Sequence, residues 1–237
     1  FASFTIPFAY AIAALIARAT DNEWLVSIRR WSVFAWLLLG VGNILGAWWA
    51  YTILGWGGYW AWDPVENAGM MPWLTMTAFL HLALIQKRRH IFKVWNVLLL
   101  ILSFNLVIFG TYITRSGMLS GISVHVFGDH GLDPFFFTFL CVTLLGSLGL
   151  LFYRRNDLKG KDYPIDLLSK ESTYYLTGVL FLGSTLIVLI GTILPVITRA
   201  ITGNEVILEP SFFDMVVGPL FLAIVLVMGI CTQLGWH

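Results

Sequence analysis

The chain has 237 residues, of which 58% are hydrophobic and 11% charged, and its mean hydropathy is +0.82. Soluble domains carry about 25% charged residues, so this composition argues against a soluble protein and indicates one that crosses a membrane several times. The net charge of +1 gives no indication of nucleic-acid binding.

The chain opens in the middle of an apolar run at Phe1, with no charged n-region or cleavage site of a signal peptide. We therefore expect it to be a piece of a longer protein.

Cys141 and Cys231 lie in separate apolar runs without C-x-x-C spacing, which argues against a thiol-redox or thiolate metal site. We expect both cysteines to be buried structural residues.

Seven apolar runs follow one another, and six of them approach the ~20 residues that a helix needs to cross the bilayer. They are a partial span at 1–17 and the runs 31–54, 68–86, 94–113, 134–153, 174–197 and 212–234. The sequence therefore predicts an all-α fold, a polytopic bundle with about 6 or 7 transmembrane helices in a single domain, 1–237.

The connections between these runs alternate in charge. Three of them hold twelve of the fourteen basic residues, namely Arg18, Arg29, Arg30, Lys87, Arg88, Arg89, Lys93, Arg154, Arg155, Lys159, Lys161 and Lys170. The other three hold only Arg115 and Arg199. Basic connections stay in the cytoplasm, so we expect 55–67, 114–133 and 198–211 to face outward.

The first outward connection is rich in tryptophan. Residues 48–62 read WWAYTILGWGGYWAW and contain five of the eleven tryptophans. An aromatic belt at the membrane interface accounts for one or two such residues. It does not account for this density, or for Gly55, Gly57 and Gly58 among the rings. Flexible backbone beside broad flat rings suits a planar aromatic ligand, so we favour a ligand platform over a simple belt.

The tryptophan segment ends in a helix-start signal. Asp63 is predicted as the N-cap, Pro64 as the first helical residue and Glu66 as the third, which is the pattern of a capping box. This structural role for the two acidic residues is as well supported as a chemical one. We expect the helix to continue to Gln86 with a kink at Pro72.

Residues 55–68, GWGGYWAWDPVENA, followed by MPWL at 71–74, resemble the WWD signature of membrane proteins that handle heme. The DPVENA ending resembles the CcmF-type heme lyase subunits of cytochrome c maturation. The likeness continues through 77–81 and 110–126, and more weakly to Gly218, so it covers most of the chain. The resemblance implies an extracytoplasmic WWD heme-handling segment at 48–67.

The resemblance also implies the site residues. Trp56, Trp60 and Trp62 would dock the heme, and His125 in the second outward connection would ligate its iron. Without the resemblance, a histidine in an exposed loop is best interpreted as solvated. The family's opposing ligand precedes the tryptophan segment, where this chain has no histidine.

The other histidines have different expected roles. His81 lies within a predicted span, where an ionisable residue is a functional hypothesis by default; a hydrogen bond to a neighbouring helix is the alternative. The resemblance implies that His81 ligates a second, stable b-type heme, whose other ligand lies further downstream than His237. His130 could offer a local alternative to His125 but, like His90, is interpreted as a solvated surface residue.

Arg115 stands near His125 in the sequence. It can form a salt bridge with Asp63 or contact a heme propionate, because guanidinium binds carboxylates in a bidentate fashion. Both interpretations stay open at this stage.

By resemblance, the expected function is that of a heme lyase, which promotes thioether attachment of heme to the CxxCH motif of apocytochrome c. The implied cofactors are two hemes b, one transient and one stable. The implied partners are heme, a heme chaperone, apocytochrome c, other maturation subunits and lipid. The expected location is the bacterial inner membrane, with the mitochondrial inner membrane as the alternative. A heme transporter of the same WWD family and a structural subunit of a split lyase are the other candidates.

Overall fold

The computed structural model describes residues 1–18, 23–55, 57–119, 123, 125, 131–160 and 166–236. Within these ranges all regular structure is helical, which confirms the predicted all-α fold. The elements are η1 (Ala2–Phe4), α1 (Thr5–Ala17), α2 (Glu23–Trp49), η2 (Ala50–Leu54), α3 (Pro64–Arg89), α4 (Lys93–Arg115), α5 (Asp133–Arg154), α6 (Lys170–Thr202) and α7 (Pro210–Cys231).

Six of the helices in the described part of the chain are long and apolar enough to cross a membrane, and Ala2–Ala17 is a shorter apolar helix. The predicted 6 or 7 spans are therefore confirmed by length and composition. The helices extend beyond several of the predicted apolar runs. The second helix starts at Glu23, before the apolar run that begins at 31, because Arg29 and Arg30 favour helix although they are not apolar.

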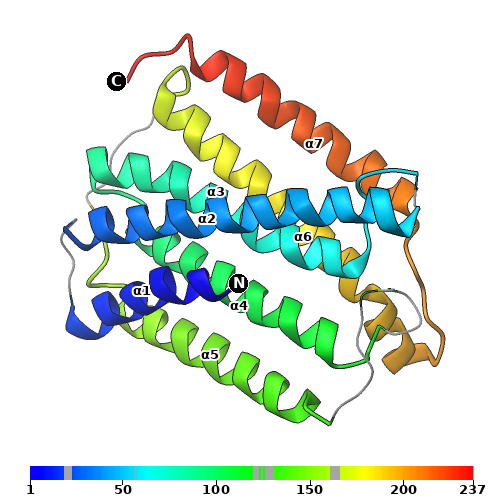
Figure 1. Cartoon of the computed structure of the whole chain (residues 1–237). Coiled ribbons are helices and arrows are strands. Elements are labelled where there is room, and N and C mark those ends of the chain that lie inside the picture. The colour runs from blue at the N-terminus through cyan, green and yellow to red at the C-terminus, as the bar shows by residue number, and fades with distance from the viewer. Residues whose placement is uncertain are drawn as a thin grey trace.

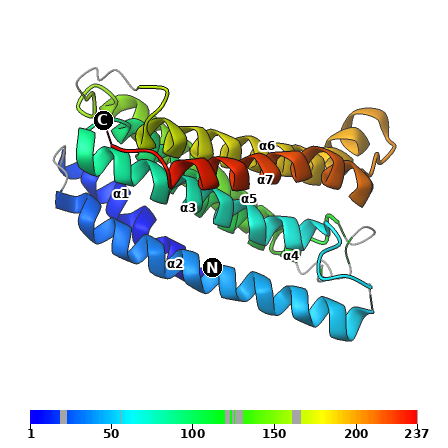
Figure 2. The ribbon, with the colours of Figure 1, turned by 90° about the horizontal axis from the view of Figure 1, so that it is seen from above.

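Helix α3 is the centre of the bundle. It packs against α2, α4 and α6, while α5 packs on α4 and α7 packs on α6. In Figure 1, α7 and α5 form the two outer edges, and Figure 2 shows α1 and α2 on one side of the other helices. The apolar stretch of α3 is 78% buried, against 17% for α2 and 11% for α5, so α3 is the only one of these three that is enclosed by protein.

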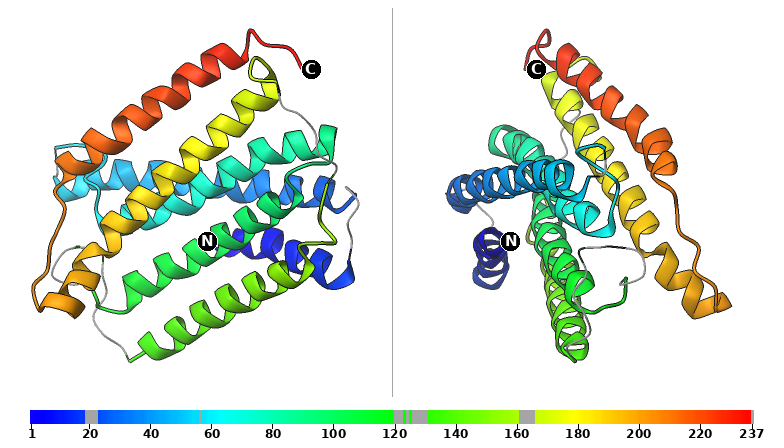
Figure 3. Two further views of the ribbon diagram at one scale, coloured as in Figure 1. Left: turned by 180° about the vertical axis from the view of Figure 1, so that it is seen from behind. Right: turned by 45° about the vertical axis from the view of Figure 1, so that its right-hand side comes forward.

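Successive long helices run in opposite directions, so their connections gather at two ends of the bundle (Figures 1 and 3). One end, called the basic end, holds the start of α2 with Arg29 and Arg30 and the end of α3 with Lys87. The other, called the tryptophan end, holds the end of α2, the start of α3 and the turn between α6 and α7. The predicted alternation of the connections agrees with this arrangement.

Polar contacts hold the helices together inside an apolar core. The Trp36 indole donates to the Thr77 hydroxyl at 2.8 Å and its ring stacks on Trp73 at 5.2 Å. Asn96 donates to Gln86 at 2.7 Å between buried side chains of α4 and α3. In a membrane, where lipid is as apolar as leucine, such interhelical hydrogen bonds help to specify which helices pair.

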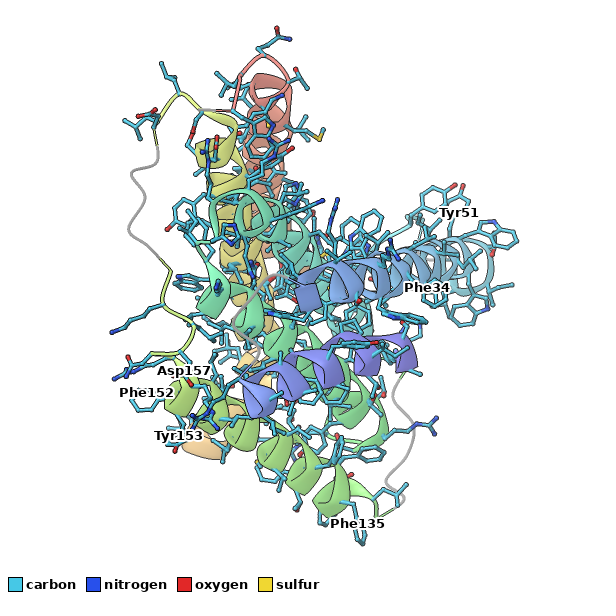
Figure 4. The ribbon with its side chains drawn as sticks, turned by 90° about the vertical axis from the view of Figure 1, so that its left-hand side faces the viewer. Phe34, Tyr51, Phe135, Phe152, Tyr153 and Asp157 are labelled. Atoms are coloured by element: carbon cyan, nitrogen blue, oxygen red, sulfur yellow. The ribbon has the colours of Figure 1, made fainter. Side chains whose placement is uncertain are left out.

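Large apolar side chains cover the outer helices. Figure 4 shows Phe34 on α2 and Tyr51 on η2, both at the outer side of the bundle, and Phe135 and Phe152 near the two ends of α5. Phe34 is 48% and Phe135 73% exposed, which suits a surface that contacts lipid.

The prediction of two buried cysteines was wrong. Both cysteines are half-buried, because the outer helices α5 and α7 that carry them are enclosed on one side only.

Candidate functional site

The tryptophan segment begins with a change of helix type. The last turn of α2 widens into η2, a π-helical turn over Ala50–Leu54, which ends at Gly55 with φ of 66°. Such turns are rare and are frequent at functional sites. The ring of Tyr51 stacks on that of Tyr59 at 4.5 Å, so the chain folds back on the end of α2. Trp56, a predicted docking residue, lies outside the described residues.

The predicted capping box at the start of α3 is confirmed. Asp63 Oδ1 accepts a hydrogen bond from the Val65 amide at 2.8 Å, and Glu66 Oε2 accepts from the amides of Asp63 at 3.3 Å and Ala61 at 2.9 Å. Both acidic side chains are thus held by backbone donors at the first turn of α3. This fixes the positions of their remaining oxygen atoms.

The same Asp63 oxygen joins the start of α3 to His125. It accepts from the Ser123 hydroxyl at 2.9 Å and lies 3.2 Å from His125 Nδ1. Ser123 Oγ in turn accepts from the His125 amide at 3.1 Å. A carboxylate beside Nδ1 favours the tautomer that is protonated there, so Nε2 keeps the lone pair that a metal ligand requires.

A pocket of about 560 Å³ opens beside His125, between the first residues of the chain, α2 and the start of α3. Its lining combines the rings of Trp49 and Trp60 with His125 and Glu66. Trp49 and His125 lie 5.7 Å apart, measured between ring centroids. Gly42 and Gly46 form part of the α2 wall, where the absence of side chains leaves room.

Among the described residues, two polar atoms of residues that line this pocket are buried without a hydrogen-bond partner. They are Trp60 Nε1, a donor, and Glu66 Oε1, an acceptor. Buried polar atoms are normally satisfied by protein, water or ligand. The volume lies within the roughly 300–1,000 Å³ of small-molecule sites, and the mixture of flat rings and few polar groups is typical of them. We call this cavity, defined by Trp49, Trp60, Glu66 and His125, the His125 pocket.

Trp62 lies away from the His125 pocket. Its φ of 57° is left-handed, its ring stands nearly perpendicular to that of Trp60 at 87°, and it stacks on Phe213 of α7 at 5.1 Å. Its indole nitrogen donates to Asp214 at 2.8 Å. The structure therefore brings Trp60, Asp63 and His125 together, whereas Trp62 joins the tryptophan segment to α7.

Arg115 is the exposed last residue of α4. Within the described residues the side-chain partners of Asp63 are Ser123 and His125, and no salt bridge between Asp63 and Arg115 is found there. Contact of Arg115 with a heme propionate stays a prediction.

His81 lies near the other end of α3 and faces α6. Its Nδ1 is 2.8 Å from the Thr77 carbonyl oxygen, to which it donates, and its ring lies 5.5 Å from Tyr174 and 6.0 Å from Phe181. The hydrogen bond from Nδ1 favours the tautomer of His81 whose Nε2 carries the lone pair. Eighteen residues of helix separate His81 from Asp63, a rise of about 27 Å. His90 is exposed, as predicted, while His130 and His237 lie outside the described residues.

Sequence reasoning did not assign individual site roles to Trp49 and Ser123, and it gave the capping role and a chemical role of Glu66 equal support. Trp49 belongs to the recognised aromatic run, and Ser123 belongs to the S-V-H motif around His125. Their roles depend on contacts between distant segments, since Ser123 and Asp63 are 60 residues apart.

Similarity to known proteins shows the family to which the chain belongs. The model of a family described as cytochrome C assembly protein matches residues 1–120. The cytochrome c-type biogenesis protein CcmF of Haemophilus influenzae is 37% identical over 100% of this chain and 36% of its own length. The CcmF proteins of Pseudomonas aeruginosa and Escherichia coli are 38% and 37% identical, with the same coverage.

A solved structure, that of the cytochrome c heme lyase CcmF, matches 99% of this chain with a TM-score of 0.78 and 34% sequence identity. The match covers 34% of that protein. The chain thus spans about 36% of the length of the curated relatives it matches. It is a membrane-helix bundle that belongs to the cytochrome c assembly protein family and is similar along its whole length to part of CcmF.

Proposed function

We propose that this chain is part of a CcmF-type cytochrome c heme lyase and that the His125 pocket holds the heme to be attached. The observation that carries the proposal is the contact of His125 Nδ1 with Asp63 at 3.2 Å, beside a pocket lined by Trp49 and Trp60. Histidines that ligate metals almost always donate their second ring nitrogen to a carboxylate or carbonyl, and this pair has that form.

The residues present fit a heme. The rings of Trp49 and Trp60 give flat apolar surfaces for the macrocycle, and the small residues of α2 leave space beside them. Trp60 Nε1 and Glu66 Oε1 provide one donor and one acceptor that have no partner in the part of the chain that the structure describes, so polar groups of the ligand or of water can satisfy them. Trp62, held by Phe213 and Asp214, anchors the segment that carries these groups.

In the proposed reaction, each thiol of the CxxCH motif adds across one heme vinyl group. The sulfur forms the new bond to one vinyl carbon and a hydrogen is added to the other, so no oxidant or reductant is consumed in the addition itself. The protein orients the heme and ligates its iron through His125, and the chemistry belongs to heme and thiol. The motif's own histidine then replaces a protein ligand, which favours release of the product.

We further propose that His81 ligates a second, resident heme b, whose other ligand comes from outside this chain. The hydrogen bond from Nδ1 to the Thr77 carbonyl oxygen supports this, because it holds the ring in the tautomer of an axial ligand. When bound, the heme would supply one-electron redox chemistry that keeps the substrate iron reduced.

The orientation follows from charge. Twelve of the fourteen basic residues belong to the three sequence segments predicted to be cytoplasmic, and those that the structure describes lie at the basic end. This supports a cytoplasmic position for that end and an outer, periplasmic position for the tryptophan segment. A heme chaperone and apocytochrome c would then approach the His125 pocket from the outer face, and other maturation subunits would bind the same protein.

The test is a set of three variants in the full-length protein, analysed by heme spectra and by the yield of mature cytochrome c. His81→Ala should remove a stable b-type signal. His125→Ala should spare that signal and stop cytochrome c maturation. His90→Ala, on the exposed surface of the basic end, is the matched control and should change neither.

A wild-type protein that purifies without heme would refute the proposal. If His125→Ala lowered delivery of heme to a downstream protein but left thioether formation intact, the transporter alternative would replace the lyase.

A further inference from the structure

A second pocket lies at the basic end, at the opposite end of the bundle from the His125 pocket. It has a volume of about 420 Å³ and is lined by Leu25, Val26, Arg29, Arg30 and Val33 of α2 and by Lys87 of α3. Three of these six residues are cationic and the other three are aliphatic. We call it the basic pocket.

The three cations of the basic pocket have no anionic partner among the described residues. The ion pairs at this end of the bundle are those of Arg89 with Glu171 at 2.7 Å and Arg154 with Asp157 at 3.6 Å. Arg29 Nε is moreover buried without a hydrogen-bond partner in the part of the chain that the structure describes. A buried guanidinium nitrogen without an acceptor calls for an anionic or strongly polar ligand.

The apolar side of the pocket continues along α2. Exposed residues recur at intervals of three or four on the face that carries Arg30, which makes them a single stripe. They are Val26, 46% exposed, Val33, 45%, Leu37, 51%, Val41, 45%, and Ile44, 70%. From Val33 to Ile44 the stripe is about 16 Å long, close to one leaflet of the ~30 Å hydrocarbon core.

We propose that the basic pocket binds an anionic phospholipid of the leaflet at the basic end. The phosphate would lie among Arg29, Arg30 and Lys87, and an acyl chain would lie along the stripe that runs from Val33. Charge and shape select this class of ligand: three cations suit an anionic headgroup, and the adjoining stripe of one-leaflet length suits a single chain. A soluble phosphate would leave the stripe unused.

The test measures lipid binding to the full-length protein by native mass spectrometry, after titration with phosphatidylglycerol or with zwitterionic phosphatidylcholine. The wild type should retain one phosphatidylglycerol in preference to phosphatidylcholine. Each basic residue near a membrane surface contributes about fivefold to binding of anionic lipid. The triple variant Arg29→Gln, Arg30→Gln and Lys87→Gln should therefore bind it about a hundredfold more weakly.

A control variant removes three exposed cations from the same end, at Arg18, Arg155 and Lys159, each replaced by Gln; it should retain the lipid. If the first triple variant does not fold, Lys87→Glu alone should lose more than fivefold, while Arg29→Lys should keep binding. Equal retention of both lipids by the wild type, or equal losses in the two triple variants, would overturn the proposal. Absence of any tight lipid would show that a segment of the longer protein covers the pocket, which also overturns it.

Discussion

Replacement of Asp63 by asparagine separates the structural role of this residue from its role beside His125. Asparagine is as good an N-cap as aspartate, so α3 should keep its first turn and most of its stability. The change removes the charge that lies 3.2 Å from His125 Nδ1 and that accepts from Ser123 at 2.9 Å. The asparagine side chain can also present its amide NH₂ to Nδ1, which favours the wrong tautomer.

The expected magnitude follows from these contacts. Loss of a carboxylate that orients a ligating histidine typically weakens metal binding 10–100-fold, or about 1.4–2.7 kcal/mol. Asp63→Ala should add the loss of the helix cap, about 1 kcal/mol of stability. Ser123→Ala keeps the carboxylate beside His125 and should weaken heme binding less than Asp63→Asn.

The assay is a heme titration of the full-length protein, with His81→Ala in the background so that only the His125 pocket contributes to the Soret band. Thermal unfolding of each variant without added heme reports the cap separately. If Asp63→Asn bound heme as tightly as the parent protein while His125→Ala did not bind it, Asp63 would not orient His125. The contact between His125 and Asp63 would then no longer support the proposed function.

Two further predictions concern the helices behind the site. Gly191→Ala would place a methyl group 2.6 Å from the Phe213 ring, on which Trp62 stacks. It should lower the free energy of unfolding by about 1–3 kcal/mol. Gly183→Ala on the same helix meets open space and should not lower it. Glu171→Gln weakens a largely buried ion pair with an arginine and should lower the free energy of unfolding by about 1–3 kcal/mol. The same change at Glu205, whose arginine partner is 67% exposed, should lower it by under ~1 kcal/mol. Equal effects within either pair would contradict the reasoning.

The bundle could be predicted from sequence because its causes are local. Hydropathy over about 20 residues identifies a span, and the alternation of basic and neutral connections orders the spans without any long-range information. The start of α3 was predictable for the same reason. The capping box at Asp63 and Glu66 depends on four consecutive residues, and the structure has it as expected.

The site was predictable only in part, because its geometry depends on contacts between distant segments. Trp62 was expected to dock the heme beside Trp60, but its direction is set by Phe213 and Asp214, about 150 residues later. A salt bridge from Arg115 to Asp63 was one of two predictions for Arg115, whereas in the structure Asp63 contacts His125, a residue 62 positions away. Resemblance identified which residues matter; only the fold shows which of them meet.

Helix α3 links the two proposed heme sites and also keeps them independent. It carries the cap that holds His125 at one end and His81 near the other, with a rise of about 27 Å between Asp63 and His81. Since α3 packs against α2, α4 and α6, it acts as a rigid spacer; the Thr77 carbonyl oxygen contacts His81 at one site, and the Asp63 carboxylate contacts His125 at the other. Effects at such distant sites add within about 0.5 kcal/mol. The free-energy cost of Asp63→Asn for stability should therefore be the same with and without His81→Ala; a larger difference would mean that the two ends of α3 are coupled.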